Sequence, residues 1–582
     1  MKAANLLRGY WRDHAPVAGI SAVLFVLCLI PVILVVLASL STTVPRPGSS
    51  GLGSLTLANF ASLMTPNAAN AFVNSLSVGL GAAVIALLVG GSLAFLCART
   101  DAPGKRFIFF VGISPMFIPA LVGALAWSFL ASPSSGFLNV ALRNLGLDFA
   151  INIYSLGGLI FVLGIYYAPY GFLLMRSSFV LMSGDLEEAA AVHGASFART
   201  LRTITLPLVL PALLGAGILV FALAMQNFPA AQVVGMPGRV DTLPTFIYRL
   251  MSATPAQSNQ AAAVSVILTI GLLIFTVLQQ RVVSRRKFTT VTGKGAIPRK
   301  VPLGGFKWLI MGYVLVYFLI SIVLPMLALL VTAMQASPFF TKITQLMQPG
   351  ALSLDRLSAT LQSLDFHVGL RNSIIVSVLA AAFGTLLSFL ASYIRHRTIS
   401  GCRGLIDFIA MTPLAIPSIV MGMGLLWTWL FIPIPVYGTV WVLVIACIAV
   451  FFPQGYQGIS ASILQIGNDL EDSAVLLGAN RSRAVRTITV PLMRVGITST
   501  FLLFLMMSMR ELSAVIFLFT SDTRILSIMV FENFENGQIQ AAASVSVYYC
   551  IVIACIAILG QVLGSMEKRR SASQNQPHSL AS

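Results

Sequence analysis

Acidic residues precede a short stretch and a glycine at two places in this sequence, one beginning at Asp185, where the stretch is Ala-rich, and the other at Asp469. Carboxylates at the start of a helix accept hydrogen bonds from its free N–H groups and favour the positive end of its dipole. We expect Asp185 to be an N-cap with Glu188 closing a capping box, and Asp469 with Asp472 to repeat that spacing. Such groups can start a short helix and stabilise its positive end.

Turn residues follow each of these predicted helices. Gly194 and Gly478 can take a positive φ and redirect the chain into a second helix. Pro207 and Pro491 stand where the next long apolar segment begins, and the start of a helix tolerates proline because the N–H lost there needs no helical partner. Each place therefore predicts a short helix, a turn and a second helix.

The two segments are copies of each other. At a constant separation of 284 positions, Asp-Leu-Glu, Gly-Ala, Arg-Thr-Ile-Thr and a proline recur in the same order. Elsewhere, Asn74-Ser75 is matched by Asn372-Ser373, and Gln260 with three alanines is matched by Gln540 with three alanines. This internal repeat indicates two copies of one structural unit.

Long apolar segments separate these features. Of the 582 residues, 57% are hydrophobic and 9% are charged, and the mean hydropathy is +0.91. Runs of about 20 apolar residues can cross a hydrocarbon layer as helices. We expect twelve spans, at 17–41, 71–98, 107–131, 154–180, 206–229, 259–280, 307–334, 372–394, 405–431, 438–463, 490–519 and 540–566.

The repeat and the spans together predict an all-α polytopic membrane protein with about 12 transmembrane helices in two parallel six-helix repeats. The two copies share one orientation because each contains an even number of spans. The predicted parts are a cytoplasmic N-terminus at 1–16, a first repeat at 17–280, a cytoplasmic linker at 281–306, a second repeat at 307–566 and a disordered cytoplasmic tail at 567–582.

The net charge of +18 follows from membrane topology. With the N-terminus in the cytoplasm, most of the 36 Lys and Arg fall on the cytoplasmic side, where membrane proteins carry their basic excess. Both termini are therefore expected in the cytoplasm, and the basic surplus does not indicate nucleic-acid binding. The first apolar run is too long for a cleaved signal peptide and predicts a retained anchor.

Residue sets for catalysis or nucleotide hydrolysis are missing from the sequence. No G-x-x-x-x-G-K-[ST] loop is present to cradle phosphates. The five histidines are scattered, and the six cysteines lie in or beside apolar segments without forming a C-x-x-C pair. We therefore expect no enzymatic activity, no metal site and no cofactor bound by this chain.

The motif E-A-A-x-x-x-G followed by I-x-L-P resembles the signature of permease subunits of binding-protein-dependent ABC importers, the MetI-like family. The first copy of the motif is Glu188-Ala189-Ala190…Gly194…Ile204-Thr205-Leu206-Pro207. The second copy is Asp472-Ser473-Ala474…Gly478…Ile488-Thr489-Val490-Pro491, which departs from the motif at Glu→Asp, Ala→Ser and Leu→Val. The resemblance covers nearly the whole chain and implies a fused, pseudo-dimeric type I importer fold.

In that family the repeated loop is a coupling helix that docks on a separate ATP-hydrolysing subunit. The resemblance thus implies two copies of an ABC ATPase using ATP and Mg at the cytoplasmic face, a periplasmic substrate-binding protein, and a bacterial inner membrane. The implied coupling residues are Asp185, Glu187, Glu188, Ala189, Ala190, Gly194 and Ala195 in the first copy, and Asp469, Glu471, Asp472, Ala474, Gly478 and Ala479 in the second. The alternative is that both segments are ordinary amphipathic connectors.

Polar side chains inside apolar segments are candidates for the transport pathway, because placing them in a membrane is costly. Arg510 and Glu511 in the eleventh span correspond, at the separation of 284, to Gln226 and Asn227 in the fifth. These four residues are candidates to line or gate the pathway; the alternative is that Arg510 and Glu511 form a structural ion pair at the outer rim. The second interpretation arises because Arg510 lies about 30 Å along its helix from Pro491.

The sequences around these pairs look like the branch of the family that serves ferric iron, aminoethylphosphonate, thiamine and polyamines. Ferric iron is favoured because fused permeases are common among the iron and phosphonate members. No acidic or tyrosine cluster is expected to hold the metal, because the periplasmic protein usually selects the cargo. The outer segments 42–70 and 335–371 are either docks for that protein or disordered connectors.

A secondary transporter of the major facilitator type would also have two parallel six-span halves. Its Gly/Asp/Arg-rich loop between spans two and three is only faintly matched by residues 99–106 and has no counterpart in the second half. A membrane enzyme or a scaffold is disfavoured by the missing catalytic residues. Uptake that requires a separate nucleotide-binding protein would distinguish the ABC permease from all three.

Overall fold

A computed structural model describes residues 15–44, 53–285, 300–337, 340–398, 403–467 and 469–574. Over these residues the chain is helical, with isolated β-bridges between loop segments. The described part contains nine helices long and apolar enough to cross a membrane, or up to twelve spans if each of three bent helix pairs counts as one. The predicted all-α polytopic fold is confirmed.

The chain forms two compact units that differ from the two sequence repeats. Unit 1 comprises Met1–Asn59, Ser363–Met529 and Ile551–Ser582, and unit 2 comprises Phe60–Gln362 and Val530–Cys550. The first apolar helix therefore belongs to unit 1 with most of the second repeat. Conversely, the helix that opens the second repeat belongs to unit 2.

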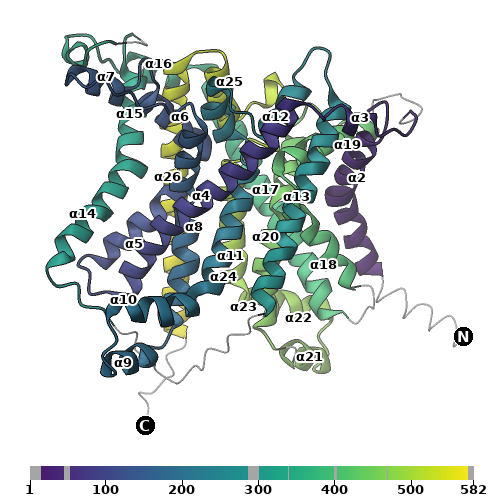
Figure 1. The fold of residues 1–582 in the computed structure, drawn as a ribbon. Coiled ribbons are helices and arrows are strands. Elements are labelled where there is room, and N and C mark those ends of the chain that lie inside the picture. The colour runs from purple at the N-terminus through teal and green to yellow at the C-terminus, as the bar shows by residue number, and fades with distance from the viewer. Residues whose placement is uncertain are drawn as a thin grey trace, which may run out of the picture. The chain divides into compact units, whose positions relative to one another are not determined.

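Unit 2 contains the helices of the first repeat from the second span onward (Figure 1). Their bounds are α4 Pro66–Arg99, α5 Lys105–Ile113, α6 Ala120–Ala131, α7 Phe137–Asn144, α8 Leu156–Leu181, α9 Asp185–Val192, α10 Phe197–Thr200, α11 Leu206–Met225, α12 Leu243–Met251 and α13 Ser258–Arg285. The unit also holds α14 Lys307–Phe318, α15 Leu324–Met334 and α16 Asp355–Gln362. Within it, α15 packs against α6 and α4 packs along α8 and α11.

Unit 1 contains the long helix Ala15–Ser39, whose last part is α2 (Ile30–Ser39). Its other helices are α17 Leu364–Arg397, α18 Arg403–Met411, α19 Ser418–Phe431, α20 Val440–Leu464, α21 Asp469–Leu476, α22 Arg481–Ala484, α23 Val490–Leu492 and α24 Arg494–Met509. Within this unit, α2 packs against α19, and α17 packs against α20 and α24. The short α3 (Ala58–Ala61), α25 (Leu526–Glu535) and α26 (Ile539–Gln574) each contribute residues to both units.

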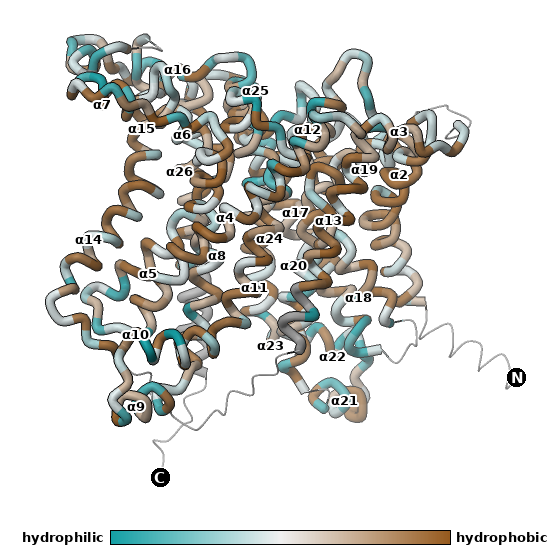
Figure 2. The backbone as a smooth tube through the Cα atoms, in the orientation of Figure 1, coloured by the Kyte–Doolittle hydropathy of each residue, from teal (hydrophilic) through white to brown (hydrophobic). Residues whose placement is uncertain are grey.

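Hydrophobic residues follow the long helices, and hydrophilic residues concentrate in the connecting segments (Figure 2). Helix α13 continues to Arg285 and α26 to Gln574, into the predicted linker and the predicted disordered tail. No glycine or proline interrupts either extension, so the helix can propagate beyond its apolar part. Residues 1–14, 286–299 and 575–582 of the predicted N-terminus, linker and tail lie outside the described residues.

Two predicted spans, 107–131 and 405–431, are broken and not continuous. The helix Lys105–Phe117 meets Ala120–Ala131 at 97°, and Arg403–Ala415 meets Ser418–Phe431 at 115°. The breaks fall at S-P-M-F-I-P and T-P-L-A-I-P, where Ile118 and its counterpart Ile416 are extended, with ψ of 124° and 123°. A residue before proline is driven out of the helical region by the proline ring, which explains both breaks.

The fifth and eleventh spans also differ from prediction. Helix α11 ends at Met225 and α24 at Met509, short of the expected 229 and 519. In unit 2 one unbroken helix runs from Phe197 to Met225, whereas in unit 1 the two parts Arg481–Leu492 and Arg494–Met509 meet at 74°.

Five five-residue π-helical turns each end two residues before a proline. They are Phe25–Leu29 before Pro31, Leu201–Thr205 before Pro207, Ala231–Gly235 before Pro237, Leu319–Val323 before Pro325 and Val485–Thr489 before Pro491. A proline inside a helix clashes with the carbonyl four residues earlier, and a widened turn relieves that clash. The repeated Pro207 and Pro491 therefore lie inside a helical path and not at its first turn.

The repeated Asn-Ser pairs hold a later helix in place in each unit. Asn74 Nδ2 donates to the carbonyl of Asp241 at 2.9 Å, and Ser75 Oγ accepts the N–H of Leu243, the first residue of α12, at 2.7 Å. In unit 1, Asn372 and Ser373 bind the segment that leads into Leu526 in the same way. The repeated Asn-Ser pairs therefore make the same kind of contact in both units.

The segments after the first helix of each repeat fold back on themselves. Ser41 pairs with Leu55 in unit 1, and Gln335 pairs with Leu352 in unit 2, each through an isolated antiparallel bridge. In the predicted outer segment 335–371, α16 and the beginning of α17 are helical. The described parts of both segments are therefore ordered, while their proposed role as docks stays a prediction.

Candidate functional site

The first repeated loop forms α9, a turn and α10, as the sequence predicted. Helix α9 begins at Asp185 itself: its N-cap is Gly184, and no side chain caps it. The predicted N-cap role of Asp185 and its capping box with Glu188 are therefore wrong, and Asp469 likewise is the first helical residue of α21. The acidic groups still occupy the first turn, where they favour the positive end of the helix dipole.

Gly194 and Gly478 take the positive φ that the sequence predicted, at 76° and 93°. Both are exposed, and a Cβ added at either would meet no atom within 4 Å. The space around each turn is open, so glycine is favoured here by its backbone conformation alone.

Burial separates the predicted coupling residues into two groups. Glu187 and Glu471 are buried, with 5% and 1% of their surface exposed. The rest are exposed or half-buried, namely Asp185, Glu188, Ala189, Ala190, Gly194 and Ala195 in unit 2 and Asp469, Asp472, Ala474, Gly478 and Ala479 in unit 1. The exposed group can meet a partner directly, whereas the two buried carboxylates face the protein.

Glu187 is bound by two elements outside its own helix. Arg99, the last residue of α4, forms an ion pair with its carboxylate and is itself fully buried. Thr205 Oγ1 donates to Glu187 Oε1 at 2.6 Å. Arg99 also donates from Nη1 to the carbonyl of Met182, just after α8, at 3.0 Å.

Glu471 has the corresponding partners in unit 1, with different geometry. Thr489 donates to Glu471 Oε1, and the Nε of Arg397, the last residue of α17, lies 3.8 Å from the same oxygen. Tyr393 adds a hydrogen bond from its hydroxyl to Glu471 Oε2 at 2.8 Å. Arg397 Nη2 donates to the carbonyl of Ile466, beyond α20, at 2.8 Å.

The contact between α4 and α10 in unit 2 is aromatic, whereas the corresponding contact between α17 and α22 in unit 1 is polar. In unit 2 the rings of Phe95 and Phe197 lie 6.3 Å apart between centroids. At the same place in unit 1, Arg481 Nε donates to the hydroxyl of Tyr393 at 3.3 Å. Arg481 also lies 3.9 Å from both Glu471 and Asp472. The two loops are therefore anchored by related but unequal contacts.

Sequence reasoning missed Arg99, Arg397 and the two threonines as site residues. It counted both arginines among the basic residues that set the topology, and it also considered Arg99 as part of the segment 99–106. The available signal was their separation of 298 positions, which is also the separation of the repeated Asn-Ser pairs.

The pathway candidates lie where the fifth and eleventh spans end. Gln226 is the C-cap of α11 and Arg510 is the C-cap of α24. Asn227 Oδ1 accepts the N–H of Ala230 at 2.9 Å, and Glu511 Oε1 accepts the N–H three residues later, from Ala514, at 2.7 Å. Asn227 and Glu511 thus share a structural role in shaping the chain after the helix. The pathway role of all four residues stays a prediction.

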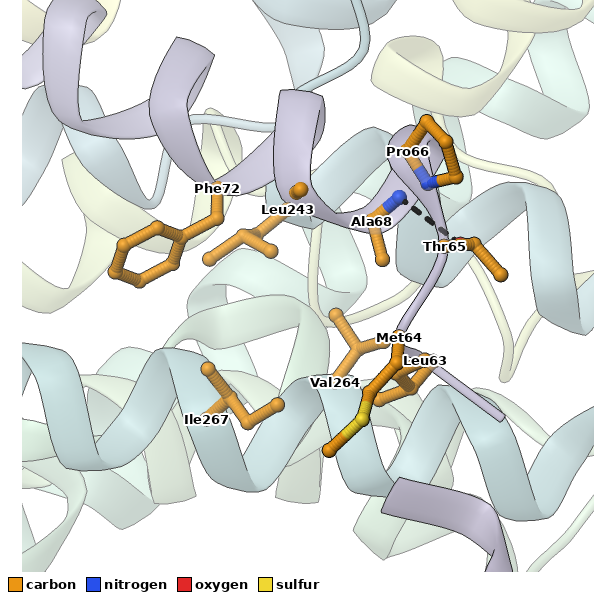
Figure 3. A pocket seen from close by; sticks show the side chains of 10 residues that line it. Leu63, Met64, Thr65, Pro66, Ala68, Phe72, Leu243, Val264 and Ile267 are labelled. Atoms are coloured by element: carbon orange, nitrogen blue, oxygen red, sulfur yellow. Dashed lines mark hydrogen bonds between the residues drawn. The ribbon is translucent and has the colours of Figure 1, made fainter. Parts of the chain in front are cut away.

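A cavity of about 500 Å³ lies elsewhere in unit 2, beside the beginning of α4 and against α12 and α13 (Figure 3). Its lining carries no charged side chain and includes Met64, Phe72, Leu243, Val264 and Ile267. None of the predicted pathway residues lines it. Across the described residues, no group of three or more His, Cys, Asp or Glu side chains could hold a metal ion.

The chain matches a family described as the binding-protein-dependent transport system inner membrane component, over residues 90–289 and 384–571. These segments cover more than half of the chain and fall on both repeats. The protein is thus an ABC importer permease, a multi-pass protein of the inner membrane. It belongs to the binding-protein-dependent transport system inner membrane component family. This membership does not support the secondary-transporter interpretation.

Curated relatives at low identity include two ferric transport permeases. The chain is 23% identical over 507 residues to the ferric transport system permease protein FbpB of Actinobacillus pleuropneumoniae, covering 85% of this chain and 71% of the relative. It is 25% identical over 485 residues to the Fe(3+)-transport system permease protein FbpB 2 of Haemophilus influenzae, covering 82% and 87%. A shorter match, 26% over 164 residues, covers 28% of this chain and 61% of the putative 2-aminoethylphosphonate transport system permease protein PhnV of Salmonella paratyphi A.

Among solved structures, the chain is similar to a bacterial ABC transporter involved in the import of the acidic polysaccharide alginate. The match has 18% sequence identity and a TM-score of 0.40, and it covers 49% of this chain and 99% of the other.

Proposed function

We propose that this chain is the translocation subunit of an ATP-driven importer that receives a small solute from a periplasmic binding protein, with ferric iron as the cargo. The loops α9–α10 and α21–α22 are its coupling elements, each docking on one copy of a separate ATPase subunit that binds ATP and Mg. The single observation that carries this proposal is the duplicated loop, folded alike in both units and held by a buried carboxylate in each.

The exposed surface of each loop supports docking on a protein partner. Leu186 and Val192 of α9 are 56% and 86% exposed, and Leu476 and Leu477 at the end of α21 are 87% and 89% exposed. These apolar side chains stand among exposed acidic residues. An apolar patch rimmed by charged groups is typical of a protein interface.

The cargo is inferred from the relatives named above. Two of them are ferric permeases matched over most of their length, whereas the aminoethylphosphonate permease is matched over a shorter part. Aminoethylphosphonate, polyamines and thiamine are the alternative cargoes for the same machinery. Parallel measurements of the uptake of radioactive ferric iron and of each radiolabelled alternative, by vesicles containing the complete transporter, test the cargo. Failure of iron uptake alongside uptake of an alternative would reject iron and leave the coupling proposal standing.

Substitution of the turn glycines tests the coupling loops. Gly194→Asp and Gly478→Asp place a charged side chain in each docking turn, so we expect at least about tenfold less ATPase to co-purify, a difference of about 1.4 kcal/mol. Matched controls exist because Gly146 (φ 76°) and Gly438 (φ 83°) have similar backbone angles and equally open surroundings. Gly146→Asp and Gly438→Asp carry the same backbone strain away from the loops and should retain the ATPase.

Normal ATPase binding and normal uptake in the Gly194→Asp, Gly478→Asp double variant would refute the coupling role.

The orientation of the chain in the membrane is tested separately with the variants Gly194→Cys and Gly146→Cys, each labelled with a thiol reagent that does not cross membranes. With both termini and the loops in the cytoplasm, only the cysteine at position 146 should react in intact cells. The reverse pattern would overturn the proposed topology.

A further inference from the structure

The buried carboxylates of the repeated loops join three helices in each unit. Glu187 of α9 is bound by Arg99 at the end of α4 and by Thr205 at the approach to α11. Arg99 extends the junction to the end of α8 through the carbonyl of Met182. Glu187 and Arg99 together thereby tie the loop to the ends of α4 and α8 and to the approach to α11.

This arrangement needs a specific reason, because burying a carboxylate away from water is unfavourable unless it is paired. The neighbouring acidic residues Asp185 and Glu188 remain exposed, so an acidic first turn alone does not require burial. Helix α9 spans only Asp185–Val192, and helices of this length are marginal without tertiary contacts. The ion pair with Arg99 supplies the contact that fixes its orientation.

The same construction occurs in unit 1 although the residues around it differ. Glu471 is bound by Thr489 and lies 3.8 Å from Arg397, which reaches the carbonyl of Ile466. Tyr393 contributes a hydrogen bond that Phe95, at the corresponding position, cannot make. Repetition of the Arg–Glu–Thr set in two units argues against an accidental contact.

We propose that Glu187 and Glu471, with Arg99 and Arg397, are positioning residues that make each coupling loop move as one body with the helix ends that it contacts. This inference rests on the proposed coupling function and assigns it a transmission element. The direct ion pair makes the unit 2 junction depend chiefly on Arg99. The unit 1 junction is shared between Arg397, at longer distance, and the hydroxyl of Tyr393.

The first test measures loop orientation and requires neither ATPase nor cargo. Spin labels at the exposed positions Ala191 of α9 and Arg106 of α5 report the distance between the loop and the helix that follows α4. We expect a narrow distance distribution in the parent chain and a broad one in Glu187→Gln and Arg99→Met. Arg99→Lys keeps the charge and should restore a narrow distribution. An unchanged distribution in both Glu187→Gln and Arg99→Met would overturn the proposal.

The second test measures coupling in the complete transporter. We expect Arg99→Met to lower the amount of radioactive ferric iron imported per ATP hydrolysed by about fivefold or more, the lower limit for typical coupling energies, while the ATPase remains bound. Lys307→Met is the control, since it breaks the part-exposed ion pair of Lys307 with Asp101 in the same unit without touching the loop. A parent chain that binds no ATPase refutes the proposed function, whereas wild-type coupling in Arg99→Met refutes the positioning role alone.

Two milder variants keep the test decisive if Arg99→Met does not fold. Thr205→Val removes one hydrogen bond to Glu187 with little change in volume, and Tyr393→Phe removes the hydroxyl bound to Glu471. Each should broaden the loop orientation in its own unit and leave the other unchanged. Two narrow distributions in these variants would contradict the proposed junctions.

Discussion

The packing around Phe504 predicts that two destabilising substitutions in unit 1 compensate each other. Phe504 of α24 is 1% exposed, and its ring lies against Gly384 of α17 and Gly455 of α20. A Cβ added at Gly384 would lie 2.7 Å from Phe504 Cε1, and one added at Gly455 would lie 2.2 Å from Cε2. Both distances are too short for carbon atoms in contact, so the ring or a helix must move.

The magnitude follows from the competing effects at each position. Overpacking a core costs about 1–3 kcal/mol, and alanine recovers up to about 1 kcal/mol relative to glycine in a helix. We therefore expect Gly384→Ala to lower the free energy of unfolding by up to about 2 kcal/mol. Phe504→Val removes the ring and leaves a cavity, and should cost somewhat less than the about 3–5 kcal/mol typical of Phe→Ala.

The first repeat already carries the pair of residues that a double substitution would introduce into unit 1. The positions corresponding to Gly384 and Phe504 are Ala86 and Val220, both fully buried. The double variant Gly384→Ala, Phe504→Val introduces this pair into unit 1, where the added methyl group occupies part of the space that the ring leaves. Its loss should be smaller than the sum of the single losses by about 0.5–3 kcal/mol, the range of coupling energies for residues in contact.

The assay is denaturant unfolding of the purified chain in detergent micelles, followed by its helical circular dichroism signal. Gly312→Ala on α14 is the control, because a Cβ added there meets no atom within 4 Å. It should leave stability unchanged or slightly increased. Single losses that add within about 0.3–0.5 kcal/mol in the double variant would refute the reasoning, since independent sites behave in that way.

Two further predictions concern buried hydrogen bonds in unit 2. Ser75→Ala leaves the N–H of Leu243 unpaired and should lower the free energy of unfolding by about 1–3 kcal/mol. Faster hydrogen exchange at the start of α12 would show this loss, and unchanged exchange would contradict it. Asn139→Ala removes three hydrogen bonds that join α7 to both ends of its loop, so limited proteolysis should cut that loop sooner, whereas the exposed Asn144→Ala should behave like the parent chain.

Local signals made several features predictable. Apolar runs located the helices, because a span must be long and hydrophobic to cross a membrane. The turn at Gly194 was predictable because a glycine after a short helix commonly takes positive φ, which depends on the residue itself. The internal repeat transferred each such prediction to a second place in the chain.

Other features depended on contacts between distant residues. Glu187 and Glu188 are adjacent and carry the same side chain, yet one is buried and the other exposed. The difference arises because Arg99 arrives from a helix far away in the chain. The predicted capping box failed for a related reason: the chain before α9 reaches Gly184 from the end of α8, and no side chain caps the helix.

The helical class and the glycine turns follow from the amino-acid sequence, because hydropathy and backbone preference act within a few residues, and comparison of the two halves adds the internal repeat. Which helices belong together depends on tertiary contacts: the first apolar helix joins most of the second repeat, and Gly304–Met334 joins the first. Apolar faces can pack against many partners, so hydrophobicity cannot specify the pairing. Complementary packing and a few buried polar contacts select one pairing of helices. Both form only after segments that are distant in the sequence have come together.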